Sequence, residues 1–224
     1  MRLSVSPWVF LGRLLLFFFV TYLLWQPVAP SYTQLLYYAS RAGVWLAELS
    51  TDPLWHGGTT LVTRGTAIFY THRNFAAFDP PIPPQGIPAE WVMANLVLLV
   101  PLMLATPAPS WRARFTRLGM ALGVALVLQV ADVVVAIKVF YASTFRGYWS
   151  RGAYDFYQFL DAFFQSWDTQ LFPFAIWAGI HFRQLLGSRT AAEPPSGVTR
   201  SHPSAPLPPQ PTTKAKRRRK PRKR

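Results

Sequence analysis

Residues 118–141 read LGMALGVALVLQVADVVVAIKVFY, an apolar run interrupted by Gln129, Asp132 and Lys138. A helix needs roughly 20 mostly apolar residues to cross about 30 Å of hydrocarbon. The run is therefore long enough to form a transmembrane helix. The composition agrees, because 51% of the 224 residues are hydrophobic and only 14% are charged. A soluble domain usually has about 25% charged residues.

Three further apolar runs occur in the chain, at residues 8–26, 91–106 and 169–186. Aromatic side chains such as Trp8, Trp25 and Trp91 stand at the ends of these runs, and such rings favour the headgroup level of a bilayer. We therefore expect an all-α integral membrane protein with about four transmembrane helices, whose membrane domain covers residues 1–187. The first apolar run is longer than that of a signal peptide, so we expect a retained anchor.

Basic residues in the short connecting segments predict the orientation. Arg112, Arg114 and Arg117 follow the second run, and nine of the eleven residues in 214–224 are Lys or Arg. We expect both termini and the segment 107–117 on the cytoplasmic side of a bacterial inner membrane. The loop 27–90 and the segment after the third run then face outward.

Residues 32–49 compete for a fifth span. Gln34, Arg41 and Glu48 recur every seven residues and form one polar stripe on a helix. We therefore expect an amphipathic helix that lies on the outer membrane surface. A second interfacial helix is expected at 154–167. The polar face of this second helix consists of Asp155, Gln158, Asp161 and Gln165. This face could pair with the Arg41 face of the first helix or be solvated.

The rest of the outer loop predicts a small β-hairpin. Residues 59–71 read TTLVTRGTAIFYT, which is typical of two short strands around a turn at Arg64 and Gly65. The prolines between Pro80 and Pro88 predict a stiff, extended spacer that leads back to the membrane.

The C-terminal segment 188–224 is rich in proline and poor in apolar residues, which predicts a disordered cytoplasmic tail. Its basic end is expected to bind anionic lipid headgroups, with a solubilising, orientation-fixing role as the alternative. Nucleic acid would bind it only without sequence preference. The basic residues are Lys214, Lys216, Arg217, Arg218, Arg219, Lys220, Arg222, Lys223 and Arg224.

Polar groups inside the apolar runs are costly, so each needs a reason. Asp132 lies near the middle of the third run with Gln129 one turn away, and no second acid is expected at its depth. It is either a proton- or substrate-handling group or a partner in an interhelical hydrogen bond. Lys138 lies near the outer end of the run, where its amine can reach the headgroups. Asn95 lies near the outer end of the second run.

Candidate catalytic residues on the outer side are His56, His72, Arg73, Asp155 and Asp161. His72 could act as a general acid or base and Arg73 as an anion clamp, although no known hydrolase or phosphate-loop motif accompanies them. The chain has no cysteine, which excludes thiolate metal sites and cysteine nucleophiles. We expect neither a metal nor a cofactor. A small transporter is a weaker alternative, because the four runs show no internal repeat.

Two segments carry a resemblance to a known family. FLGRLLLFFFVTYLLWQPVAPSYTQLL at 10–36 and LVTRGTAIFYTHRNF at 61–75 resemble exosortase H-associated membrane proteins, which are found alongside exosortase-type protein-sorting transpeptidases. Exosortases use a Cys, Arg and His set, and this chain has no Cys. The resemblance therefore implies a non-catalytic accessory partner in protein sorting. A membrane enzyme with an outer-face hydrolytic or transfer site is the alternative.

The four apolar runs predict that the chain resists extraction from membranes. After a wash of isolated membranes with alkaline carbonate, the protein should stay in the membrane pellet, because helices that cross the bilayer are held by hydrocarbon rather than by charge. Immunoblotting of pellet and supernatant checks this. Release into the supernatant would contradict an integral membrane protein.

Overall fold

The structure is a computed structural model that describes residues 6–49, 57–145, 147, 149–167 and 171–190. These residues form five α-helices and one small three-stranded sheet. The elements in chain order are α1 (Pro7–Leu49), β1 (Thr59–Arg64), β2 (Ala67–His72), the 3-10 helix η2 (Arg73–Ala77), β3 (Gln85–Pro88), α2 (Ala89–Ala105), α3 (Trp111–Thr144), α4 (Arg151–Trp167) and α5 (Leu171–Thr190).

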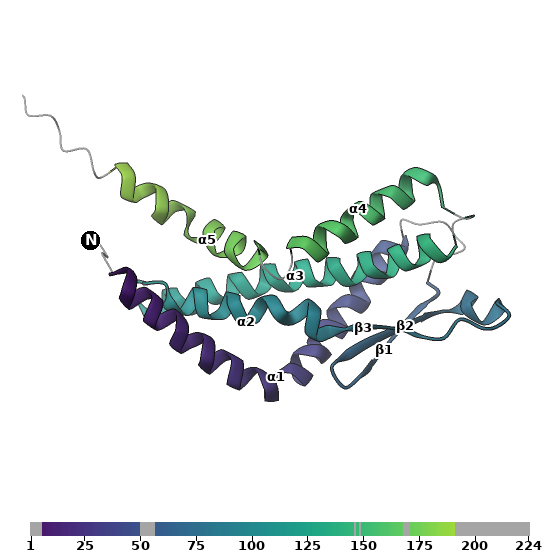
Figure 1. The fold of residues 1–224 in the computed structure, drawn as a ribbon, viewed down its shortest axis with the longest axis horizontal. Coiled ribbons are helices and arrows are strands. Elements are labelled where there is room, and N and C mark those ends of the chain that lie inside the picture. The colour runs from purple at the N-terminus through teal and green to yellow at the C-terminus, as the bar shows by residue number, and fades with distance from the viewer. Residues whose placement is uncertain (1–5, 50–56, 146, 148, 168–170, 191–224) are drawn as a thin grey trace, which may run out of the picture.

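The elements are arranged along one long axis (Figure 1). The start of α1, the connection from α2 to α3 and the end of α5 lie at one end, which we call the terminal end. The sheet, the end of α3 and the start of α4 lie at the opposite end, which we call the sheet end. The segments expected on the two sides of the membrane are thus found at opposite ends of the molecule.

Two helices, α1 and α3, are long and apolar enough to cross a membrane. Two shorter apolar helices, α2 and residues Leu171–Phe182 of α5, accompany them. Each of the four apolar runs in the sequence thus lies on a separate helix. The side chains of α5 and α2 are linked where Trp177 Nε1 donates to Thr106 Oγ1 at 2.7 Å.

Helix α1 differs from the expected break after residue 26. It continues to Leu49 with Pro27 and Pro30 inside it and bends in its middle (Figure 1). Proline has no amide proton for the helical hydrogen bond, and its ring clashes with the carbonyl four residues earlier. A helix that continues through a proline therefore bends there. The expected surface helix 32–49 is therefore the second half of α1.

The second half of α1 packs against α3 instead of lying apart from it. At Gly43 the helices come so close that a Cβ would lie 2.5 Å from Val130 Cγ1. The expected polar stripe is only partly solvated, because Gln34 and Arg41 are exposed but Glu48 is buried. The face toward the bundle consists of Ala29, Thr33, Leu36, Ser40, Val44 and Glu48.

Helix α3 begins earlier than the apolar run. Ser110 caps its N-terminus, where Ser110 Oγ accepts from the Ala113 amide at 3.2 Å. A Ser side chain satisfies one of the amide groups that have no partner in the first turn. The expected connection 107–117 is therefore short, and α3 carries the basic residues of that segment in its first two turns.

The hairpin expected at 59–71 is present and has a third strand. Strands β1 and β2 are antiparallel with Arg64 opposite Ala67, and Gly65 in the turn has φ +62°, a conformation that suits glycine. Strand β3 pairs with β2, with Ala67 opposite Pro88. The expected proline-rich spacer therefore ends in an edge strand. Proline is tolerated there because an edge strand leaves some amide positions without a ladder partner.

Helix α4 runs back along the second half of α3 (Figure 1). Phe164 is buried against Phe172 of α5, with ring centroids 5.9 Å apart. On its polar face, Gln165 Nε2 donates to Asp161 Oδ2 at 2.8 Å. Arg41 lines a cavity between α1 and β1, whereas Asp161 lines a different cavity.

A buried hydrogen-bonded network joins three helices near the bend in α1. The Tyr32 hydroxyl of α1 donates to Gln129 Oε1 of α3 at 2.6 Å. Gln129 Nε2 donates to Asn95 Oδ1 of α2 at 2.8 Å. Gln129 is fully enclosed and Asn95 nearly so. Two of the polar residues in the apolar runs thus bind each other.

Replacement of Gln129 by Leu should lower the free energy of unfolding by about 1–3 kcal/mol, because both hydrogen bonds are lost where water cannot replace them. Denaturant unfolding of the protein in detergent micelles measures the change. Val127→Leu is the matched control, since Val127 lies on the same helix and is 68% exposed. Equal stabilities of the two variants would contradict a structural role for the network.

Candidate functional site

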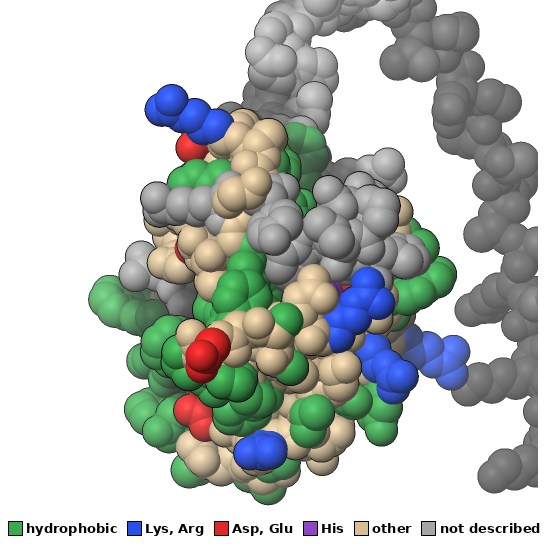
Figure 2. Space-filling view, turned by 90° about the vertical axis from the view of Figure 1, so that its right-hand side faces the viewer, with side chains coloured by type: hydrophobic (Ala, Val, Ile, Leu, Met, Phe, Trp, Pro, Cys, Tyr) green, Lys and Arg blue, Asp and Glu red, His purple; other side chains and the backbone are tan. Residues whose placement is uncertain are grey.

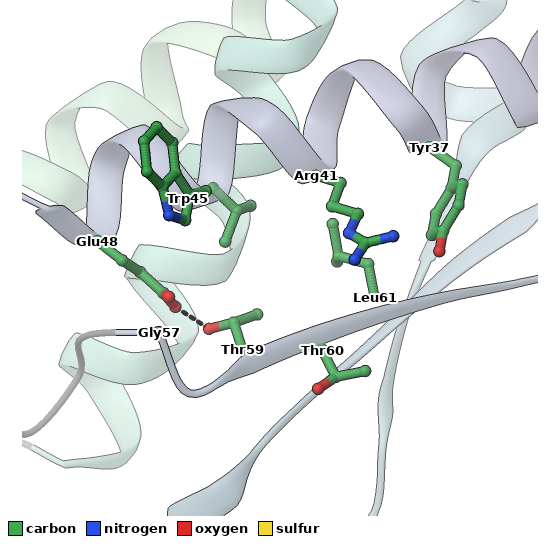
Figure 3. A pocket seen from close by; sticks show the side chains of 9 residues that line it. Tyr37, Arg41, Trp45, Glu48, Gly57, Thr59, Thr60 and Leu61 are labelled. Carbon is green, nitrogen blue, oxygen red and sulfur yellow. Dashed lines mark hydrogen bonds between the residues drawn. The ribbon is translucent and has the colours of Figure 1, made fainter.

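A pocket opens at the sheet end between the second half of α1 and β1 (Figure 3). We call it the α1–β1 pocket. Its volume is about 320 Å³, within the usual range for small-molecule sites. Tyr37 and Arg41 point from α1 toward β1. The wall residues used below are Tyr37, Arg41, Trp45, Glu48, Thr59 and Thr60.

Glu48 lines the pocket and is only 2% exposed. Thr59 Oγ1 donates to Glu48 Oε1 (Figure 3). The Tyr141 hydroxyl lies 2.7 Å from the same Thr59 oxygen. A threonine hydroxyl has one proton, so Tyr141 donates to Thr59 while Thr59 donates to Glu48. This chain connects α3 through β1 to α1.

Lys138 lies behind this chain, one turn before Tyr141 on α3. It is 1% exposed, so its amine does not reach out to solvent as the sequence suggested. Lys138 Nζ lies 6.0 Å from the centre of the Tyr141 ring and 5.9 Å from that of Trp149. Nζ makes no hydrogen bond within the described residues. Lys138 and Glu48 are both buried polar residues of the sheet end.

His72 and Arg73 point in different directions. His72 is 2% exposed, and its Nδ1 accepts from the Asn74 amide at 3.2 Å. Its ring packs against Tyr141, with centroids 5.5 Å apart. Arg73 is exposed. The structure therefore does not assemble the two into an acid/base group beside an anion clamp. His56 lies outside the described residues.

A second cavity, of about 650 Å³, lies between the sheet, α2, α3 and α4. We call it the Asp132–Asp161 cavity, because both carboxylates line it. A second acid, Asp161 of α4, thus lines the same cavity as Asp132. Asp155, the other acidic candidate on α4, is exposed and lines neither cavity. Tyr70 also lines this cavity, and burial raises the pKa of its phenol well above the usual value.

The α1–β1 pocket has side chains that can bind a ligand or a partner. Within the described ranges, no three His, Asp or Glu side chains gather as metal ligands. His72, the expected acid/base group, lines neither cavity. The α1–β1 pocket instead offers the exposed guanidinium of Arg41 and the exposed ring of Trp45, which are side chains typical of recognition sites.

Sequence reasoning did not identify Glu48, Thr59 and Tyr141 as one group. Glu48 looked like the end of a solvated stripe, and Thr59 and Tyr141 like ordinary strand and membrane-boundary residues. One signal existed in the spacing, because Glu48 continues the four-residue steps of Ser40 and Val44 on the buried face of α1. The partners on β1 and α3 depend on the tertiary fold.

Comparison of the chain with protein-family models, curated protein sequences and solved structures finds no match. Its function is therefore inferred from its residues and their geometry.

Substitution of Gly58 by Ala should lower the free energy of unfolding by about 1–3 kcal/mol, a typical cost of overpacking. A Cβ on Gly58 would lie 2.1 Å from His72 Nε2, and the enclosed imidazole has no room to move away. Thermal unfolding in detergent measures the loss. The control is Gly119→Ala, since nothing lies within 4 Å of a Cβ there.

The double variant with His72→Ala separates this clash from other causes. The ring that collides is then absent, so the Gly58→Ala change should cost much less in that background. An equal cost with and without His72 would show that Gly58 does not position the imidazole.

Proposed function

We propose that the chain is a multi-span protein of the bacterial inner membrane that acts as a non-catalytic accessory partner of an exosortase-type protein-sorting system. The spans are the first half of α1, α2, the first part of α3, and α5. The second half of α1, the sheet, the end of α3 and α4 form a head on the outer side. Both termini are cytoplasmic.

The length of α3 supports this division. With 34 residues it extends about 50 Å at about 1.5 Å per residue, whereas the hydrocarbon core is about 30 Å thick. Arg112, Arg114 and Arg117 lie in its first turns and keep that end in the cytoplasm. Counted from Arg117, Asp132 is then about 22 Å along the helix, in the outer third of the hydrocarbon rather than at its middle.

The single observation that carries the accessory role is an exposed apolar stripe on the second half of α1. Its large side chains follow helical spacing and remain exposed, with Tyr38 at 63%, Trp45 at 57% and Leu46 at 60%. Figure 2 looks onto the sheet end and shows apolar side chains along its flanks. A contiguous apolar surface outside the bilayer indicates a docking site for another protein.

The position of the stripe favours a partner in the same membrane. The stripe follows directly from the lipid-facing first half of α1, where Phe19 is 62% and Leu23 is 70% exposed. A transmembrane partner can cover the first half of the helix inside the bilayer and the second half directly outside it. Arg41 borders the stripe and adds a charged group for orientation.

The basic cluster 214–224 complements this arrangement, although it lies outside the described residues. Placed beside the inner leaflet, it attracts anionic headgroups at about 1 kcal/mol per basic residue near the surface. The protein is thus held on both faces of the membrane, by its partner outside and by lipid inside.

The double substitution Trp45→Ala and Leu46→Ala should abolish co-purification of an exosortase-type protein from detergent-solubilised membranes, because large buried aromatic anchors dominate interface energies. The amount of the chain in the membrane should not change, since both residues are exposed. Mass spectrometry of the affinity-purified complex checks this.

The matched control is Phe159→Ala, a 65% exposed aromatic on α4 outside the stripe, which should leave the complex intact. Unchanged partner recovery in the α1 variant would contradict the docking role. An Arg73→Ala variant that keeps its partner but loses function would favour an enzyme.

A further inference from the structure

The Asp132–Asp161 cavity has the form of a ligand site separate from the α1 stripe. Its volume of about 650 Å³ falls in the range of small-molecule pockets, which are mostly apolar with a few polar groups. The polar groups come from two helices, Asp132 from α3 and Asp161 from α4. The apolar wall includes Ile87, Trp91, Val92, Val139, Phe140 and Phe164.

The charge of this cavity is opposite to that of the chain. The protein has 23 Lys and Arg against 9 Asp and Glu, yet the lining contains two Asp and no Lys, Arg or His. Asp161 is held in place by Gln165, whose Nε2 donates to it at 2.8 Å. Charge complementarity therefore selects a cation as the ligand's polar end.

Aromatic rings in the same wall suit the same ligand. Trp91 and Phe140 line the cavity beside the carboxylates, and aromatic faces attract organic cations. Trp91 is 74% exposed at the start of α2, where a Trp marks the headgroup level of a bilayer. On the membrane placement proposed above, the cavity opens at the outer headgroup layer.

We propose that the Asp132–Asp161 cavity binds a membrane lipid with a protonated amine headgroup. The ammonium group lies between the two carboxylates and donates hydrogen bonds to them. The acyl chains lie along the wall that contains Val92, Val139 and Phe164. This ligand matches the acidic groups, the apolar wall and the boundary position at once, whereas an anionic lipid would meet two like charges.

The test uses the purified full-length chain in a neutral detergent with dioleoyl phosphatidylethanolamine as the probe. Native mass spectrometry measures the fraction of the protein that carries bound phosphatidylethanolamine over a range of lipid concentrations. Asp132→Asn and Asp161→Asn together should weaken binding by about tenfold or more, the loss expected for a charge-assisted hydrogen bond. Asp155→Asn, on the same helix but exposed, should bind as the unmodified chain does.

Two further comparisons test whether the loss of phosphatidylethanolamine binding arises at the cavity. Ala136→Phe, which fills the cavity without a change in charge, should also weaken phosphatidylethanolamine binding. Dioleoyl phosphatidylglycerol, which the basic tail attracts, should not bind more weakly to any of these variants. The single Asn variants are measured beside the double variant, with thermal unfolding as a check of folding.

Equal phosphatidylethanolamine binding by the unmodified chain, the double Asn variant and Ala136→Phe would overturn the proposal. So would preferential displacement by a lysine-rich peptide, which would assign the cavity to a protein ligand. The assay needs no partner protein. A negative result here therefore leaves the accessory role untouched, and loss of the partner in the α1 variant does not affect this site.

Discussion

The hydrogen bonds from Tyr32 to Gln129 and from Gln129 to Asn95 hold three helices together at the level where α1 bends. In the membrane placement proposed above, the hydrophobic effect adds little between helices, so interhelical hydrogen bonds and close packing hold them together. The network fixes the second half of α1 against α3 just beyond Pro27 and Pro30. The position of that half in turn determines where β1, the α1–β1 pocket and the apolar stripe can be.

Beyond this network, the sheet end encloses several polar side chains. Glu48, Thr59 and Tyr141 form one hydrogen-bonded chain, and Lys138 lies behind it. Removing one member of such a buried set leaves an uncompensated polar group, so the set is costly to disrupt. His72 belongs to the same enclosed region. Exposed aromatic and basic groups around this region support the proposed docking role.

Much of the helical layout could be predicted from apolar runs alone, because the hydrocarbon thickness sets their length. The hairpin also followed from local chemistry, since Gly65 suits its tight turn. Continuity of α1 through Pro27 could not be predicted, because local propensity favours a break and packing on α2 and α3 overrides it. The burial of Glu48 and the shared cavity of Asp132 and Asp161 likewise depend on contacts between segments distant in the chain.

In the proposed arrangement, the sheet end and the terminal end lie on opposite sides of one membrane. The chain has no cysteine, so single cysteines can report on each end without interference. Arg64→Cys places a thiol beside the hairpin turn and Pro109→Cys places one in the α2–α3 connection, both at exposed positions. A membrane-impermeant maleimide should label the first in intact cells and the second only after lysis. Labelling of both in intact cells, or of Pro109→Cys alone, would contradict the account.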